Sequence, residues 1–190
     1  MSRIGKIPIS IPTGVTVSID KNKVVTVKGK NGTLYQKISS SGISLEIEDA
    51  KAVVKCATNQ KRHKAMHGLY RQLINNMIIG VSSGFKKELL LHGVGFRAKV
   101  SGQLLELSIG YSHPIFFVLP DEVKATVESV KGQDDKIILT AHDKQLLGEV
   151  AAKIRSFRKP SSYLSKHKRH RGVRYANEFL RTKAGKTASK

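Results

Sequence analysis

The chain has 190 residues, and its 34 Lys and Arg against 14 Asp and Glu give a formal net charge of +20 at pH 7. With 39% hydrophobic residues, the composition excludes wholesale disorder and is typical of one folded domain or two small ones. The single cysteine, Cys56, excludes a disulfide scaffold and a cysteine-rich zinc module, whereas the large positive charge indicates a polyanionic partner.

Residues 15–57 are predicted to form short strands. Apolar and polar residues alternate there with the period of two that is typical of strands with one buried face. Asn31 and Gly32 predict a hairpin turn, because the two central residues of a type I′ turn need positive φ angles. The expected strands lie at residues 15–19, 24–27, 34–38, 43–47 and 52–57.

From about Asn59 the apolar residues recur at spacings of three and four, which predicts a helix with one apolar stripe. Asn59 is expected to cap this helix and Gly80 to end it. The stripe consists of Met66, Tyr70, Leu73 and Met77.

The second half repeats this order of elements. Strands are predicted at residues 88–91, 105–109, 115–119, 123–127 and 137–140. A helix capped by Asp143 follows, and its apolar stripe consists of Leu147, Val150, Ile154 and Phe157.

The two halves match after a shift of 84 residues, which places Asn59 on Asp143 and Arg71 on Arg155. The predicted fold class is therefore α+β, with two repeated small domains and a basic C-terminal extension. Each domain is expected to be a mostly antiparallel sheet with one helix packed on one face, which leaves the other face free for solvent or a partner. The expected boundaries are residues 1–81, 82–157 and 158–190.

Several patterns suggest chemistry but lack the context that this chemistry needs. Residues 93–98 fit a loose dinucleotide-binding pattern, yet a strand and a turn are expected after the glycines instead of the helix that would hold a pyrophosphate. His63 and His67 share one helix face, but lysine and arginine surround them and no acid accompanies them as a metal ligand. Cys56 is predicted to be buried filler, and Asp134 with Asp135 to form a turn. The sequence thus predicts no catalytic residue, no metal site and no cofactor.

The C-terminal segment carries the strongest signal. Residues 153–190 contain thirteen Lys and Arg against one acid, Glu178. Cations of this density neutralise phosphates and displace counterions, and interleaved tyrosine and histidine rings can stack on unpaired bases. The alternative is a solvated, flexible basic tail. The candidate cations are Lys153, Arg155, Arg158, Lys159, Lys166, Lys168, Arg169, Arg171, Arg174, Arg181, Lys183 and Lys186, and the candidate rings are Tyr163, Tyr175, His167 and His170.

Collinear motifs along almost the whole chain resemble one known family, the bacterial-type large-subunit ribosomal protein six. They lie at residues 1–9, 27–32, 67–71, 75–77, 93–98, 110–114, 143–146 and 151–155. The resemblance implies two repeated domains and direct binding of large-subunit (23S-type) rRNA, chiefly through the second domain and the tail. It also implies a position near the stalk base and the factor-binding region, beside other large-subunit proteins, without enzymatic activity.

The tail departs from the family pattern by five additional residues between Tyr163 and Tyr175. The family's rRNA-binding roles are therefore carried over only to residues that keep the register: Tyr163, Arg171, Gly172, Arg174, Tyr175, Lys183 and Lys186. Secondary RNA contacts are expected from basic residues and histidines of the first domain: Arg3, Lys6, Lys61, Arg62, His63, Lys64, His67 and Arg71.

Two alternative functions differ from rRNA binding. A general nucleic-acid-binding protein, for instance one that binds duplex DNA, would bind DNA and folded rRNA equally well, although no helix-turn-helix or zinc-finger spacing supports it. A metal-dependent nuclease would use His63 and His67.

The expected location is the cytoplasm, in a bacterial rather than an organellar ribosome. The longest apolar run, residues 115–119, is too short to span a bilayer. The first residues show no signal or transit peptide, and the single cysteine fits a reducing compartment. Neither a membrane nor a small-molecule substrate is expected as a partner.

Overall fold

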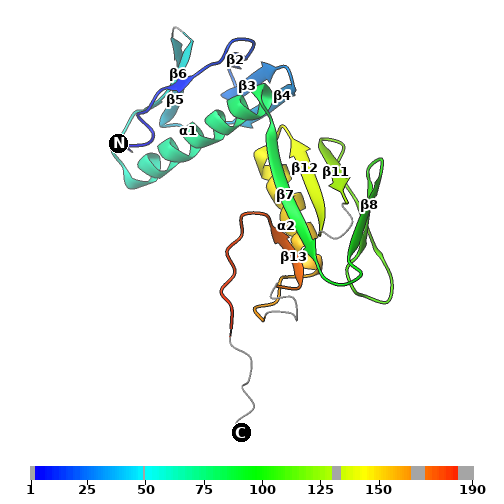
Figure 1. The fold of residues 1–190 in the computed structure, drawn as a ribbon. Coiled ribbons are helices and arrows are strands. Elements are labelled where there is room, and N and C mark those ends of the chain that lie inside the picture. The colour runs from blue at the N-terminus through cyan, green and yellow to red at the C-terminus, as the bar shows by residue number, and fades with distance from the viewer. Residues whose placement is uncertain (1–2, 49, 130–133, 164–169, 184–190) are drawn as a thin grey trace. The chain divides into compact units, whose positions relative to one another are not determined.

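A computed structural model describes residues 3–48, 50–129, 134–163 and 170–183 (Figure 1). The described residues form strands β1 (Ile9–Ser10), β2 (Thr16–Ile19), β3 (Val24–Gly29), β4 (Gly32–Lys37), β5 (Ile43–Glu48) and β6 (Lys51–Cys56), followed by helix α1 (Lys61–Ser82). They continue with β7 (Phe85–His92), β8 (Arg97–Ser101), β9 (Leu104–Ser108), β10 (Ile115–Val118), β11 (Val123–Glu128), β12 (Asp135–Ala141), α2 (Lys144–Phe157) and β13 (Gly172–Tyr175). Within these residues, neither helix is long and apolar enough to cross a membrane.

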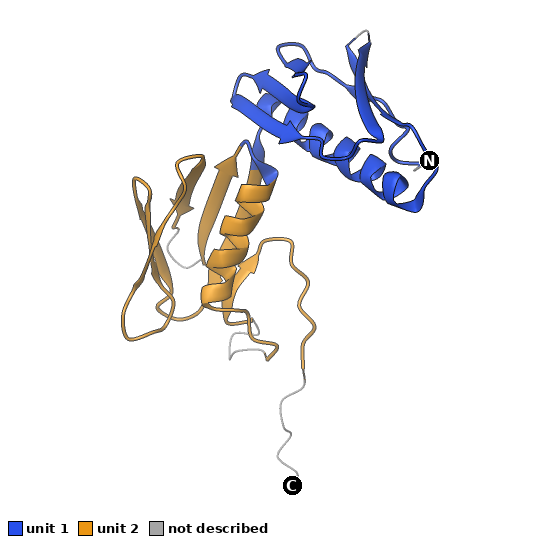
Figure 2. Ribbon diagram, turned by 180° about the vertical axis from the view of Figure 1, so that it is seen from behind, with its two compact units in different colours: residues 1–85, 142–144 blue, residues 86–141, 145–190 orange. Residues whose placement is uncertain are grey.

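The chain divides into two compact units (Figure 2). Unit 1 comprises residues 1–85 and 142–144, and unit 2 comprises residues 86–141 and 145–190. The predicted class, α+β with two helices and mostly antiparallel sheets, is confirmed. The structure places the division after Phe85 and groups the described residues of the C-terminal segment with unit 2, whereas the sequence prediction divided the chain after residues 81 and 157.

Unit 1 contains two three-stranded antiparallel sheets, β2-β3-β4 and β1-β6-β5, against which α1 packs. The alternation in the strands turns one row of side chains inward, so that Val25 and Val27 of β3 meet Leu45 and Val54 of the other sheet in one core. Ile74 of α1, fully buried, closes this core. The helical stripe predicted from the spacing thus packs on strands, as expected.

The hairpin predicted at residues 31–32 is present, but its turn is of another kind. Gly29 pairs with Gly32 across β3 and β4, so the two central residues are Lys30 and Asn31. Neither has a positive φ, and the positive φ of 136° falls on Gly32, the first residue of β4. The glycine is therefore needed one position later than a type I′ turn requires.

Helix α1 begins one residue later than predicted and ends two residues later, at Ser82. Gln60, instead of Asn59, precedes its first turn, and it makes no side-chain capping hydrogen bond. Gly80 lies inside the helix, where a Cβ atom would overlap the backbone oxygen of His142. This glycine permits close approach of the 142–144 segment and does not end the helix.

Unit 2 contains the four-stranded sheet β11-β12-β7-β13 and the three-stranded sheet β10-β9-β8. Helix α2 runs along the larger sheet (Figure 2) and buries Leu147, Val150, Ala151 and Ile154. The core of the sheets includes Leu89, Leu107 and Leu139, all fully buried.

Strand β13 was not predicted, because it has only four residues and lies within a segment dominated by charged residues. It pairs antiparallel with β7, with Gly172 opposite His92 and Tyr175 opposite Leu89. Val173 is fully buried in this pairing. Part of the segment expected to be a tail is therefore the edge strand of the larger sheet.

The turn expected at Asp134 and Asp135 is wrong for Asp135, which begins β12 and is only 7% exposed. Its carboxylate accepts hydrogen bonds from the Ala98 backbone N–H at 3.0 Å and from the Ser129 hydroxyl. The Asp134 carboxylate lies 2.6 Å from Nδ1 of His92. A buried carboxylate needs such partners, and the apolar–polar alternation of a strand cannot indicate them, because they lie outside β12, one of them 37 residues away.

Candidate nucleic-acid interface

The described residues after α2 are held to each other by backbone hydrogen bonds. The Ser161 N–H donates to the Arg171 carbonyl at 2.9 Å, and the Val173 N–H donates to the Arg158 carbonyl at 2.8 Å. The Lys183 N–H donates to the Ser162 carbonyl at 2.9 Å. In the described part of this segment, the alternative of a solvated, flexible tail is therefore not supported.

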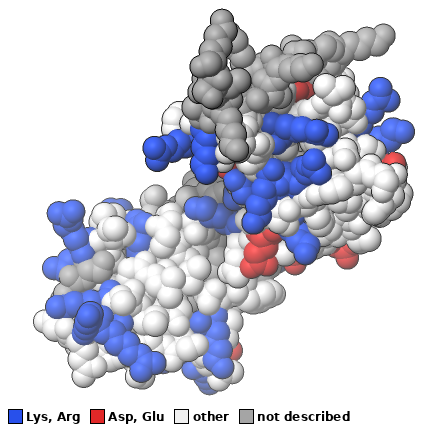
Figure 3. Space-filling view, turned by 90° about the horizontal axis from the view of Figure 1, so that it is seen from below, with Lys and Arg blue, Asp and Glu red and all other residues white. Residues whose placement is uncertain are grey.

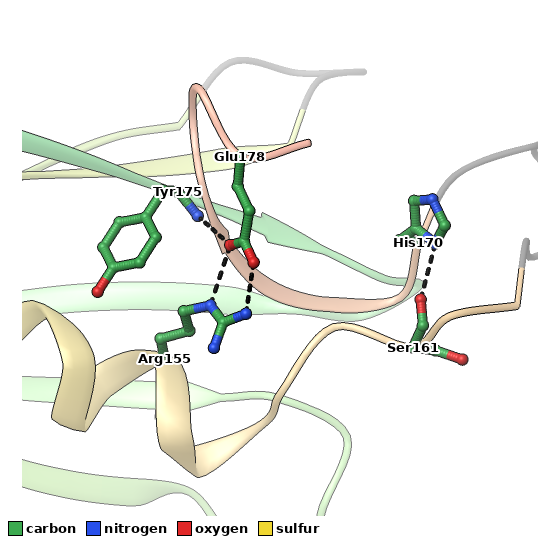
Figure 4. Close-up of polar contacts among 5 residues, drawn as sticks. All are labelled: Arg155, Ser161, His170, Tyr175 and Glu178. Atoms are coloured by element: carbon green, nitrogen blue, oxygen red, sulfur yellow. Dashed lines mark hydrogen bonds and ion pairs between the residues drawn. The ribbon is translucent and has the colours of Figure 1, made fainter. Parts of the chain in front are cut away.

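His170 adds a side-chain contact to this framework. Its Nδ1 lies 2.7 Å from the Ser161 carbonyl oxygen, to which it donates (Figure 4). Its Nε2 lies 3.4 Å from the Thr182 hydroxyl. His170, which was predicted as a ring that stacks on bases, thus links residues 161 and 182 through its two ring nitrogens.

Gly172 has a packing role. Its φ is +139°, and a Cβ atom there would lie 2.6 Å from Cα of Pro160 and 2.7 Å from the Lys159 carbonyl oxygen. Only glycine allows β13 to approach residues 159–160 so closely. Because Gly172 is buried, it positions its basic neighbours and does not itself present a group to a ligand.

Arg155 is bound within the protein. Its Nε donates to Oε2 of Glu178 at 2.9 Å and its Nη2 donates to Oε1, while the Tyr175 N–H donates to Oε2 at 3.2 Å (Figure 4). The hydrogen bonds between the two side chains lower the pKa of Glu178 below its ordinary value and raise the pKa of Arg155 above its own. Glu178, the single acid of the C-terminal segment, thus forms an ion pair with Arg155, one of the predicted RNA-binding cations.

Tyr175 is held in the same group. The Arg155 guanidinium lies 5.8 Å from the centroid of its ring, and the Lys87 ammonium lies 5.4 Å from it. Tyr175 is half-buried. Because two cations already contact the Tyr175 ring, Tyr163, which is 54% exposed, is the better candidate for stacking on a base.

Two other arginines lie over aromatic rings of unit 2. The Arg158 guanidinium is 4.8 Å from the centroid of Tyr111, and the Arg171 guanidinium is 5.4 Å from that of Phe96. The Tyr111 hydroxyl donates to the Phe157 carbonyl at 2.9 Å. Such contacts restrict the arginine side chains before any ligand arrives.

Phe96 and Tyr111 were missed as contributors to this site. They lie in the glycine-containing motifs at residues 93–98 and 110–114, and the first of these leads directly into β8, as expected from the failed dinucleotide pattern. The motif rejected as a dinucleotide site contains Phe96, but nothing in the sequence indicates that Phe96 lies under an arginine 75 residues later or Tyr111 under one 47 residues later.

The remaining described cations are available at the surface. Lys and Arg side chains predominate over Asp and Glu on the face shown in Figure 3. Lys166, Lys168, Arg169 and Lys186 were also predicted as contacts, and they lie outside the described residues, as does His167. We define the C-terminal basic surface as Lys153, Arg158, Lys159, Tyr163, Arg171, Arg174, Arg181 and Lys183, of which Arg158 and Arg174 are half-buried and the others exposed.

The residues of unit 1 that were predicted to make secondary RNA contacts fall into three groups. Arg3, Lys6, Lys61, Arg62 and Lys64 are exposed. His63 is half-buried, with Nδ1 2.5 Å from the Thr58 hydroxyl, and Arg71 donates from Nε to the Ile7 carbonyl at 3.4 Å.

His67 forms the third group, and its expected surface contact is not supported. It is 1% exposed, and its Nε2 donates to the Val54 carbonyl at 2.8 Å. The helical period turns this residue toward β6, one turn after exposed Lys64. Among the described residues, no three His, Cys, Asp or Glu side chains are grouped so that they could hold a metal ion.

Cys56 is half-buried, and its thiol donates to the Thr58 carbonyl at 3.1 Å. The thiol is thus hydrogen-bonded at the end of β6 and is less buried than predicted. This contact belongs to the turn before α1 and not to the C-terminal basic surface.

The fold and this surface define a class of protein: two α+β units with a strongly basic C-terminal segment, whose described residues are held by backbone hydrogen bonds and present cations suited to a polyanion. The family model of ribosomal protein L6 matches residues 11–84 and 92–167. The chain belongs to this family, and its predicted resemblance is confirmed.

Curated bacterial relatives match the chain over its full length. It is 54% identical to the large ribosomal subunit protein uL6 of Amoebophilus asiaticus (strain 5a2), and the match covers 100% of both chains. The corresponding proteins of Cytophaga hutchinsonii and Salinibacter ruber are 52% and 50% identical, again over 100% of both chains. The two segments of the family match also agree with two repeats.

Proposed function

We propose that this protein is a structural constituent of the large ribosomal subunit that binds large-subunit rRNA directly through the C-terminal basic surface. The observation that carries the proposal is that exposed cations such as Lys159 and Arg171 project from a backbone held by hydrogen bonds. Membership of the ribosomal protein L6 family supports the identity of the partner.

Binding would draw on charge and on preorganisation. Each ammonium or guanidinium that meets a phosphate releases condensed counterions, which favours association at low salt. Arg158 and Arg171 lie over rings, so less side-chain entropy is lost when they meet the phosphates. Tyr163 would stack on an unpaired base.

The position we propose is near the stalk base and the factor-binding region, in contact with neighbouring large-subunit proteins. The ribosome concerned is that of the bacterial cytoplasm. We propose no enzymatic activity, since the role of the protein is to hold folded rRNA.

Neutralising three exposed cations tests the proposal without deleting β13. Lys159→Gln, Arg181→Gln and Lys183→Gln would be combined, and the dissociation constant for large-subunit rRNA measured against salt concentration. The log–log slope of the unaltered protein should lie near −4 to −5 for about six phosphate contacts, and the variant should lose about two to three units of slope.

A matched variant with Lys86→Gln, Lys99→Gln and Lys124→Gln removes the same charge from exposed positions elsewhere in unit 2. Its slope should stay close to that of the unaltered protein, and an equal loss in both variants would overturn the assignment of the surface. Equal affinity for duplex DNA and rRNA would instead favour a general nucleic-acid-binding protein.

A further inference from the structure

The sheet β2-β3-β4 of unit 1 has an outer face whose chemistry differs from the rest of that unit. The register places Val25, Val27 and Leu34 on the core side and turns the alternate residues outward. We call the outward residues the sheet face: Thr16, Ser18, Val24, Thr26, Lys28, Thr33, Tyr35 and Lys37.

An aromatic ring lies on this face, on the edge strand β4 and in the row between the two lysines. Tyr35 is 69% exposed, and the register sets it in one cross-strand row with Thr26 and Ser18. Lys28 lies in the row on one side and Lys37 in the row on the other, and both are exposed. The ring is therefore flanked by two cations and by hydroxyl groups.

The positive charge of this face is unopposed. The strands β2, β3 and β4 contain no Asp or Glu, and neither Lys28 nor Lys37 has an ion pair within the described residues. Residues 16–37 contain five lysines and one acid, Asp20, at the margin of the face, where its carboxylate accepts a hydrogen bond from the Lys21 N–H.

The neighbouring sheet of unit 1 shows the contrast. Lys55 forms an ion pair with Glu46, and Lys51 lies opposite Glu48 in the register of β5 and β6. Hydrogen bonding to Glu46 raises the pKa of Lys55. Lysines that only keep a surface solvated are balanced by acids there, which makes the absence of acids from the sheet face informative.

From these observations we infer that the sheet face is a second RNA-binding surface, which takes an RNA segment with an unpaired base. The base would stack on Tyr35, while Lys28 and Lys37 neutralise phosphates on either side and threonine and serine hydroxyls bond to sugar or phosphate oxygens. An exposed ring between cations on an open sheet is suited to single-stranded RNA, because every base has a π-face. The surface shares the partner class of the proposed function but none of its residues, so either can fail alone.

The first test compares two pairs of substitutions in the full chain. Lys28→Gln with Lys37→Gln should reduce the salt slope of large-subunit rRNA binding by about 1.5 units. Lys51→Gln with Lys55→Gln removes the same charge from the balanced sheet and should leave the slope unchanged. An equal loss in the two variants would overturn the inference, because total charge would then explain it.

Tyr35 separates stacking from charge. Tyr35→Ser should weaken binding roughly tenfold at constant salt slope, whereas Tyr35→Phe should bind like the unaltered protein. Thermal unfolding of each variant establishes that the fold is intact. Unchanged affinity of folded Tyr35→Ser would overturn the stacking contact.

The last test identifies the partner directly. A photoreactive phenylalanine derivative in place of Tyr35, in assembled large subunits, should form its crosslink with RNA. A crosslink to a protein, or none at all, would overturn the inference. The triple variant of the C-terminal basic surface tests the proposed function separately, since it leaves the sheet face intact.

Discussion

The guanidinium of Arg155 makes two hydrogen bonds to the carboxylate of Glu178, the single acid among residues 153–190. Both side chains are largely shielded from solvent, with 27% and 17% exposed. The pair joins α2 to the segment that follows β13. It makes Arg155 a structural residue within a segment where the sequence predicted only RNA-binding cations.

Glu178→Gln should therefore destabilise the protein. The substitution removes charge-assisted hydrogen bonds and leaves Arg155 without its counterion, at an expected cost of about 1.5–3 kcal/mol in the free energy of unfolding. Urea denaturation measures this difference. Glu46→Gln is the control, because it breaks the exposed pair with Lys55 and should change stability little.

The contribution of Glu178 should depend on pH with a defined sign. Because Arg155 holds the pKa of Glu178 below its ordinary value of 4.5 in the folded state, the stabilisation is fully present above that value. It is lost as pH falls through the lowered pKa. The stability difference between the unaltered protein and Glu178→Gln should thus be constant near neutral pH and shrink in acid; a difference that grows in acid would contradict the pairing.

Gly172→Ala should loosen β13. The new Cβ would meet the backbone of Pro160 and Lys159, and alanine resists a φ of +139°. We expect a loss of about 2–3 kcal/mol, together with faster hydrogen exchange of the Val173 amide. Gly102→Ala is the matched control: its φ is +63° but nothing lies within 4 Å of the added atom, so it should cost less.

His67→Ala should affect stability and not RNA binding. The substitution leaves a cavity and an unpaired Val54 carbonyl in the core of unit 1, which should cost about 2–4 kcal/mol. Lys64→Ala, one turn earlier and exposed, should leave stability nearly unchanged. Affinity for rRNA, measured where His67→Ala is still folded, should equal that of the unaltered protein; a selective loss of affinity would restore His67 as a surface contact.

Tyr111→Phe and Tyr111→Leu should separate two functions of this residue. The phenylalanine variant keeps the ring under Arg158 and loses only the hydrogen bond to the Phe157 carbonyl. The leucine variant loses both, so rRNA affinity should fall further, by about 0.5–1 kcal/mol relative to phenylalanine. Equal affinities of the two variants would show that the ring does not position Arg158.

Much of the local structure could be predicted because its signal is local. Alternation over residues 43–47 and the three–four spacing from Met66 to Met77 reflect which side chains a strand or helix turns toward a core. The C-terminal end of α1 lies beyond its predicted position, because Gly80 allows close packing against His142 and does not end the helix. The domain boundaries at residues 81 and 157 remain predictions.

The sequence alone determined the two α+β repeats, the family and the concentration of positive charge near the C-terminus, because periodicity, collinear motifs and composition need no knowledge of distant contacts. Only the tertiary structure decided which charged and aromatic groups remain free to bind. Arg155 is paired with Glu178, and His67 is buried against β6. Arg158 lies over Tyr111 and Arg171 over Phe96. Each of these outcomes depends on which distant residues the fold brings into contact, and therefore on packing that residue type and spacing do not encode.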